Sequence, residues 1–135
     1  MAGQRFQGPG WEVDSAGEPG ILRLTVRGRP GLESMKQFVV AHNAAIDGFA
    51  GADYKVLCDI REMQPLAPDV AELFGQAKVY SDSQPNFRGS GVWTSSAVVS
   101  LQHARTSKTS GVASTELITS DEKALRAHLA KVWRE

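Results

Sequence analysis

Residues 54–74, YKVLCDIREMQPLAPDVAELF, combine a strand, a connecting loop and the start of a helix. Apolar and polar side chains alternate over residues 55–60, and this period of two predicts a strand that is buried on one face only. Pro68 suits the first turn of a helix, because its missing N–H would have no partner there. Apolar residues follow at helical spacing: Val70, Leu73, Phe74 and Ala77. The stretch therefore predicts a β-α unit with its helix packed on a sheet.

The chain before this unit predicts a hairpin and a helix. Residues 21–27, ILRLTVR, alternate like the strand at 55–60, and residues 11–13 form a shorter strand before a turn-rich segment. An amphipathic pattern over residues 32–46 predicts a helix that ends at Gly48. Residues 1–10 are rich in Gly, Gln and Pro without periodicity, so we expect a flexible N-terminal arm.

The chain after the unit predicts two more strands and two more helices. Residues 81–91 are polar and predict a long loop, followed by a short strand at 92–94. Ser95 or Ser96 can cap a third helix, and a fifth strand covers 112–118. One face of the third helix carries Val98, Leu101, Gln102 and Arg105. A capping box of Thr119 and Glu122 begins a last helix, whose buried stripe is Leu125, His128, Leu129 and Val132.

The predicted order is β-β-α-β-α-β-α-β-α, which indicates an α/β fold with a mixed five-stranded sheet. Strands that are buried on both faces are continuously apolar, whereas two strands here alternate, so we expect the helices mainly on one face. The other face becomes a candidate interaction surface. Its members are Ile21, Arg23, Thr25 and Leu57, to which we add Phe87 in the 81–91 loop as either an anchor or a recognition aromatic.

Bulk composition narrows the function classes. The 135 residues fit one domain, which we place at 11–135. Fifteen Lys and Arg balance fifteen Asp and Glu, which argues against nucleic-acid binding. A lone cysteine, Cys58, fits a reducing compartment, and no apolar run approaches the ~20 residues that cross a bilayer. With no secretion-signal pattern at residues 1–10, we expect a cytoplasmic protein without stable membrane insertion.

Four residues form the candidate ligand site: Arg61, Ser95, Ser96 and Arg105. Ligands of open α/β sheets gather beyond the carboxyl ends of the strands, where Arg61 and the free amides of a helix start can hold an anion. A solvated loop with local ion pairs and a plain helix cap explain the same residues. No nucleophile elbow, dinucleotide fingerprint or zinc spacing is present in the sequence, so we predict no catalytic residue, metal or cofactor.

The histidines and the cysteine have plain structural interpretations. His42 and His128 fall on apolar helical stripes, where buried structural histidines are more common than ligands. A shared proton or metal site would require their two helices to meet in space. Cys58 lies on the inward face of its strand, which favours an inert buried thiol over a nucleophile.

The run from Trp11 to Trp133 resembles the SpoIIAA-like or STAS domain family, which has the anti-sigma-factor-antagonist fold. The 54–74 stretch looks like the central strand, loop and following helix of that family, and TSDEKALRAHL at 119–129 looks like its closing helix. The resemblance implies a regulatory or binding role, usually through protein partners. In the antagonist branch a Ser or Thr before the helix is phosphorylated, but residues 63–69 contain neither, so no phosphoswitch is carried over.

We therefore expect a non-enzymatic regulatory or protein-interaction domain that binds a protein partner or forms a homodimer. The alternative is a small-molecule, lipid or anion binding module on the same fold. A third hypothesis, an unrecognised hydrolase that uses Ser95 or His103, has the least support.

Overall fold

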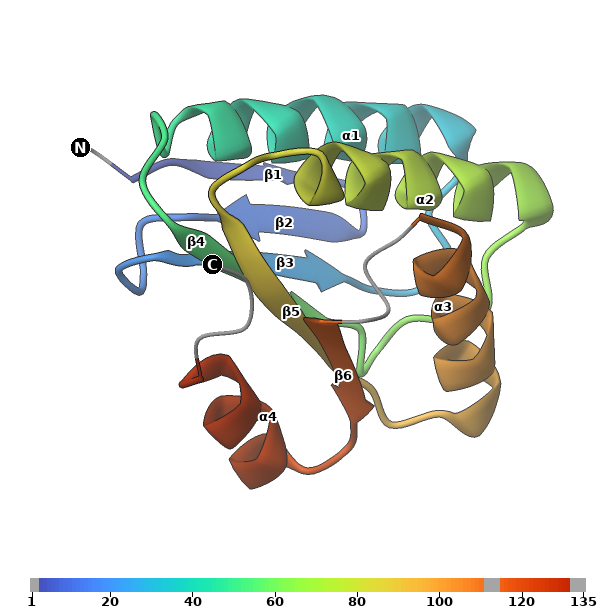
Figure 1. The fold of residues 1–135 in the computed structure, drawn as a ribbon. Coiled ribbons are helices and arrows are strands. Elements are labelled where there is room, and N and C mark those ends of the chain that lie inside the picture. The colour runs from blue at the N-terminus through green and yellow to red at the C-terminus, as the bar shows by residue number, and fades with distance from the viewer. Residues whose placement is uncertain (1–2, 111–114, 132–135) are drawn as a thin grey trace.

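The computed structural model describes residues 3–110 and 115–131 as a mixed sheet with helices on both of its faces (Figure 1). Within these residues, the sheet has six strands in sequential order: β1 Arg5–Gly8, β2 Trp11–Asp14, β3 Ile21–Val26, β4 Tyr54–Asp59, β5 Phe87–Trp93 and β6 Glu116–Thr119. The helices are α1 Leu32–Asp47, α2 Pro68–Asp82, α3 Ala97–Ser110 and α4 Glu122–Leu129. Strands β1 to β3 pair antiparallel, and β3 to β6 pair parallel.

The strand count is the first difference from the sequence-based prediction. Residues 5–8, inside the predicted arm, form the additional strand β1, in which Phe6 pairs with Val13 and packs against the core. Strand β5, which corresponds to the predicted short strand at 92–94, begins at Phe87, so the predicted 81–91 loop is shorter. Part of the predicted strand 112–118, and Val132 of the last helix, lie outside the described residues.

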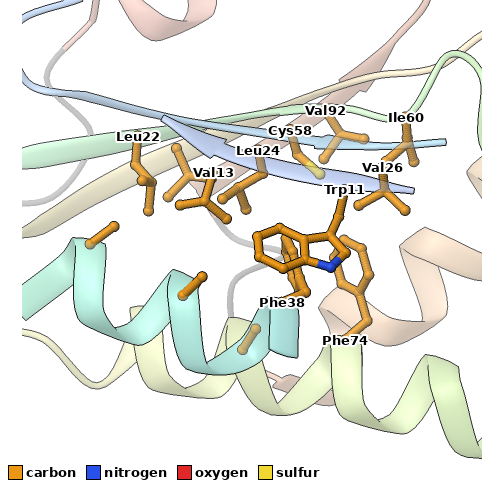
Figure 2. Close-up of a cluster of buried hydrophobic side chains, with 14 of the residues drawn as sticks. Trp11, Val13, Leu22, Leu24, Val26, Phe38, Cys58, Ile60, Phe74 and Val92 are labelled. Atoms are coloured by element: carbon orange, nitrogen blue, oxygen red, sulfur yellow. The ribbon is translucent and has the colours of Figure 1, made fainter. Parts of the chain in front are cut away.

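Helices α1, α2 and α3 lie on the face of the sheet that forms the main core. Leu24, Val56 and other inward-facing strand residues meet Phe38 of α1 and Phe74 of α2, whose rings stack with centroids 5.5 Å apart. Figure 2 shows Trp11 of β2 beside Phe38, and the centroids of these two rings lie 6.0 Å apart in an edge-on arrangement. The alternation that predicted one buried face in β3 is confirmed, because Leu22, Leu24 and Val26 are all buried.

Helix α4 covers part of the opposite face. Leu125 and Leu129 of α4 pack on Leu57 of β4, with Ile21 and Trp93 at the margin of this second cluster. Leu57, predicted on the interaction surface, is therefore completely buried. The expectation of helices mainly on one face is confirmed, with α4 as the exception.

Phe87 also corrects the predicted interaction surface. It is the first residue of β5 and is fully buried, with its ring 5.7 Å from that of Tyr54. Its polar neighbours in sequence suggested a loop, but the ring fills the core below the amino end of β4. Phe87 is therefore a core residue and cannot contact a partner.

Candidate functional site

An arginine and a tryptophan stack at the carboxyl ends of the parallel strands. The backbone N–H of Ile60 donates to the carbonyl of Trp93 at 2.8 Å, which holds the start of the loop after β4 beside the end of β5. Arg61 follows in this loop, and its guanidinium carbon lies 3.5 Å from the centroid of a Trp93 ring. The stacking orders a long cationic side chain at the edge of the sheet.

Asp59, the last residue of β4, fixes the orientation of Arg61. Its carboxylate accepts hydrogen bonds from Nε and Nη2 of Arg61 at 3.0 and 2.8 Å, and from Arg23 of β3 at 3.1 Å. Burial alone would raise the pKa of Asp59, but the hydrogen bonds from Arg61 and the charge of Arg23 lower it below its usual value. Two guanidinium groups therefore share one carboxylate at neutral pH.

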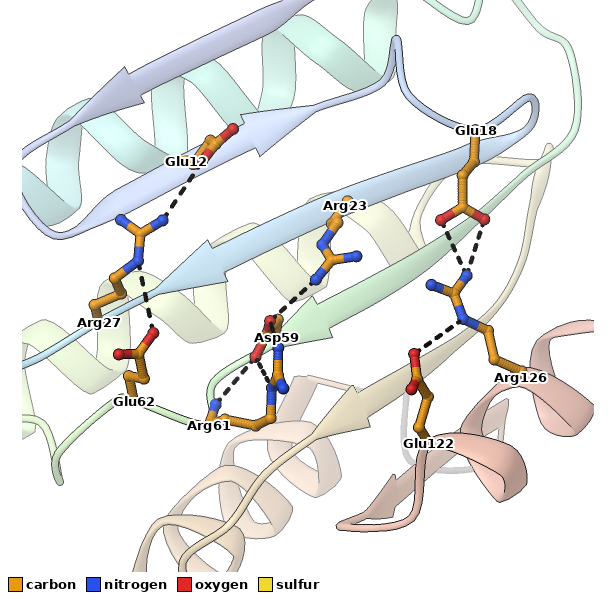
Figure 3. Close-up of polar contacts among 9 residues, drawn as sticks. All are labelled: Glu12, Glu18, Arg23, Arg27, Asp59, Arg61, Glu62, Glu122 and Arg126. Carbon is orange, nitrogen blue, oxygen red and sulfur yellow. Dashed lines mark hydrogen bonds and ion pairs between the residues drawn. The ribbon is translucent and has the colours of Figure 1, made fainter.

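Two further arginines on the same face of the sheet each lie between two carboxylates, whereas Arg23 and Arg61 share one, as Figure 3 shows. Arg27 lies between Glu12 and Glu62 at 3.5 and 4.0 Å, and Arg126 of α4 lies between Glu18 and Glu122. The part of this face that α4 leaves open is thus polar and internally paired. Of its predicted members, Arg23 pairs with Asp59, Thr25 remains partly exposed, and Ile21 packs under α4.

The four residues predicted as a ligand site do not converge on one point. The Ser95 hydroxyl donates to the carbonyl oxygen of Arg61 at 2.7 Å, which joins these two residues. The Ser96 hydroxyl accepts from the backbone N–H of Val99 at 3.3 Å, so Ser96 caps α3 as the plain interpretation predicts. Arg105 lies further along α3, at a groove of about 390 Å³ against α2.

A second groove runs between the start of α3 and the end of β6. It has a volume of about 620 Å³ and no charged residue in its lining. Hydroxyl side chains line much of it: Thr94, Ser95, Ser96, Ser100, Thr119 and Ser120. The rest of the lining is apolar and includes Leu101, Ala104 and Ile118. Ser95 and Ser96 belong to this groove, whereas Arg61 and Arg105 are not in its lining.

The histidines and Cys58 lie apart. His42 and His103 face the main core from α1 and α3, whereas the Nε2–H of His128 in α4 donates to the carbonyl of Ser90 at 2.8 Å. In the described residues no group of three His, Cys, Asp or Glu side chains could hold a metal ion. Cys58 is buried, and burial raises the pKa of its thiol to about 12. The thiol is therefore protonated and shielded.

Helix α3 has an unusual distribution of side chains. Val98 and Leu101 point to solvent and are 62% and 61% exposed, with the exposed Ala97 and Ala104 beside them. We call these four residues the outer face of α3. Its inward side carries mainly polar groups: Val99, Gln102, His103, Thr106 and Ser107. The face predicted from Val98, Leu101, Gln102 and Arg105 is therefore divided: Val98 and Leu101 point to solvent, whereas Gln102 bonds to the backbone of Leu66 and Arg105 borders the groove against α2.

A buried ion pair lies under α3. Lys78 of α2 donates from Nζ to Glu116 of β6 at 2.8 Å and to Ser107 of α3 at 2.7 Å. Glu116 also accepts hydrogen bonds from the hydroxyls of Ser107 and Ser90, the latter at 3.2 Å. Burial would raise the pKa of Glu116, but the Lys78 ammonium outweighs it and lowers this pKa well below its usual value. Sequence inspection missed this cluster, because its members lie far apart in the chain.

Comparison with known proteins identifies the architecture. No family model and no curated protein matches the sequence. An uncharacterised protein of the DUF3478 family from Shewanella loihica PV-4, described as having a SpoIIAA-like fold, superposes with a TM-score of 0.61 at 12% identity, over 96% of this chain and 94% of that chain. An anti-sigma factor antagonist from Mycobacterium paratuberculosis superposes with a TM-score of 0.58 at 12% identity, over 93% and 100%.

These two superpositions show that the chain has a SpoIIAA-like fold, as its resemblance to the STAS domain family implied. Among the residues that the structure describes, no helix is long and apolar enough to cross a membrane.

Proposed function

We propose that this SpoIIAA-like domain is a non-catalytic regulatory domain that binds another protein through the outer face of α3. The observation that carries the proposal is the exposure of Val98 and Leu101 on a helix whose inward side is largely polar. Helices on the surface of a domain ordinarily turn their apolar side to the core. The reverse arrangement leaves an apolar strip that gains free energy when a partner covers it.

The charges near this strip indicate the chemistry of the partner. Arg105 and Lys108, in the second half of α3, are both exposed and basic, and the described part of the helix carries no acidic residue. A partner that covers Val98 and Leu101 with apolar side chains and presents a carboxylate toward Lys108 is complementary in both respects. We therefore assign the outer face to an apolar segment of another protein with an acidic residue at one end.

The absence of chemistry at the predicted serine and histidine supports a non-catalytic role. Ser95 donates its hydroxyl proton to the backbone of Arg61, and His103 is buried among Phe74 and Glu116, with its Nε2 3.8 Å from the carboxylate. Burial and the Lys78 charge lower the pKa of His103 to about 4, so its ring is neutral at pH 7. A general base needs access to its substrate, and His103 has none.

The alternative of a small-molecule module has one structural feature in its favour. The groove lined by Thr94, Ser96 and Thr119 is large enough for a small polar ligand. Arg61 and Arg105, the predicted cationic contacts, are not in its lining, so this groove favours a neutral ligand over an anion. A thermal-shift screen of neutral polar metabolites tests it, because a specific ligand must raise the melting temperature and Ser96→Ala must reduce that effect.

Site-specific photocrosslinking in the native cell tests the proposed partner surface. A photoreactive residue at position 101 should capture one protein that mass spectrometry identifies, whereas the same residue at position 40 should capture none. Val40 of α1 is a matched control, since it is apolar and 71% exposed. With the purified partner, excess unlabelled wild-type domain should abolish the crosslink, and Leu101→Asp domain should not.

Two results would overturn the proposal. The first is an equal yield of the same products at positions 101 and 40, which would mean that the outer face has no specific partner. The second is a crosslink between two copies of this chain, which would assign the face to self-association.

A further inference from the structure

We infer that α3 opens independently of the rest of the domain, and that Ser107 latches it onto the buried Lys78–Glu116 pair. The inference rests on the proposed function, because α3 carries the docking face and its position would determine whether that face is assembled. Ser107 then acts as a positioning residue for binding, without touching the partner.

The underside of α3, which faces the rest of the domain, is mainly polar. Gln102 forms two hydrogen bonds with the backbone of Leu66, one from Nε2 to the carbonyl and one from the amide N–H to Oε1, both at 2.8 Å. Of the described apolar residues of α3, Val99 alone is buried. Water can replace hydrogen bonds when a helix separates, whereas it cannot replace buried apolar contacts. Opening α3 therefore costs less than separating α1 or α2.

The Lys78–Glu116 ion pair is formed without α3. Lys78 and Glu116 belong to α2 and β6, so their contact at 2.8 Å does not depend on α3. Ser90 of β5 also donates to Glu116 from outside α3. When α3 separates, each charge keeps its partner, and no unpaired buried charge opposes the movement. The pair is a fixed anchor, and α3 joins it through a side chain that can be released.

Ser107 is the residue of α3 that completes this anchor. Its hydroxyl accepts a hydrogen bond from Lys78 at 2.7 Å and donates one to the Glu116 carboxylate. Hydrogen bonds to charged groups are stronger than those between neutral groups. The contacts of two neighbouring residues are weaker: Thr106 lies beside Gly75, and the His103 ring meets the edge of Phe74 at 5.4 Å with its Nε2 3.8 Å from the Glu116 carboxylate. Of these three residues, Ser107 therefore holds the second half of α3 most strongly.

Hydrogen–deuterium exchange of the isolated domain tests the opening directly. Amides of residues 99–108 should exchange faster than those of α1 and β4, which report global unfolding. Ser107→Ala should accelerate exchange in α3 about tenfold and leave α1 and β4 unchanged. Ser90→Ala is the matched control, because it removes a hydrogen bond to the same carboxylate from the strand side, and it should not accelerate α3 selectively.

Binding to the partner links the latch to function. Ser107→Ala should raise the equilibrium constant for opening of α3. Where the open form becomes the dominant one, binding to the partner should weaken by the same factor. Leu101→Asp should abolish binding without changing exchange. Equal exchange rates in α3, α1 and β4, or a uniform effect of Ser107→Ala on all three, would overturn the latch. Because exchange needs no partner, this failure is distinct from a failure of the proposed docking face.

Discussion

Leu125 of α4 packs directly on Gly91 of β5, where a Cβ atom would overlap the leucine side chain. Leu129 lies close to the same point, with two of its atoms 3.5 Å from that Cβ position. The glycine lets α4 approach the sheet on the face opposite to the other helices, and this approach buries Leu57. Without it the apolar members of that face would remain exposed.

Gly91→Ala should destabilise the protein by about 1–3 kcal/mol, because the added methyl group overpacks the contact with α4. Urea denaturation measures the change in the free energy of unfolding. Leu125→Ala removes the overlapping atoms, so the cost of Gly91→Ala should fall by more than half in that background. Equal costs in the two backgrounds would show that α4 does not contact Gly91 in solution.

Asp59→Asn should lower the free energy of unfolding by about 2 kcal/mol, because Arg23 and Arg61 lose their shared negative charge. The carboxyl side chain of Asp59 is 8% exposed, so water compensates little. Glu62→Gln is the control: this carboxylate is 78% exposed and 4.0 Å from Arg27, and its loss should cost less than about 0.5 kcal/mol. Similar losses for the two variants would contradict the assigned roles.

Stability should fall as the pH decreases from 7 to 5. Burial lowers the pKa of His42 and of His103 from 6.5 to about 4, so the folded protein keeps both rings neutral while the unfolded chain takes up protons. The stability that this provides is complete above pH 6.5 and is lost toward pH 4. Each histidine should contribute a decrease of about 2 kcal/mol between pH 7 and pH 5. His103→Gln should remove about half of the dependence, and an unchanged slope would refute its burial.

Cys58 should resist thiol reagents in the folded protein. Its sulfur is buried, and a pKa of about 12 leaves almost no thiolate at pH 8. Reaction with an aromatic disulfide should be at least about a hundredfold slower than in urea-unfolded protein. Rapid labelling of the native domain would place Cys58 at an accessible or activated site instead.

The sequence predicted the order of the elements well, because their patterns are local. The alternation at 21–27 and Pro68 each mark an element through their own chemistry, and the structure confirms both. Helix α1 does end at Asp47, but Gly48 has right-handed helical geometry with φ −63° and not the left-handed cap conformation that glycine favours. Strand β1 could not be recognised, since its four residues are stable through pairing with β2 and contain one apolar side chain that packs on the core. Phe87 was assigned to a loop because its neighbours in sequence are polar, whereas it is the first residue of β5.

The candidate surface could be predicted less well, because it depends on where α4 packs. Leu57 has the alternation of a half-exposed strand and is buried only because Leu125 and Leu129 cover it. In α3 the pattern identifies a common face for Val98 and Leu101 but not its direction. Lys78 and Glu116 lie far apart in sequence, and only the fold brings them together.

The affinity of the domain for its crosslinked partner tests the central claim most directly. Calorimetric titration of the purified partner should give a dissociation constant at least tenfold weaker for Val98→Asp and for Leu101→Asp than for the wild type, and a change of less than twofold for Val40→Asp. All three substitutions are at exposed positions, so unchanged melting temperatures should accompany them. Equal affinity of the α3 variants, the Val40 variant and the wild type would contradict the assignment of the outer face of α3 as the regulatory docking surface.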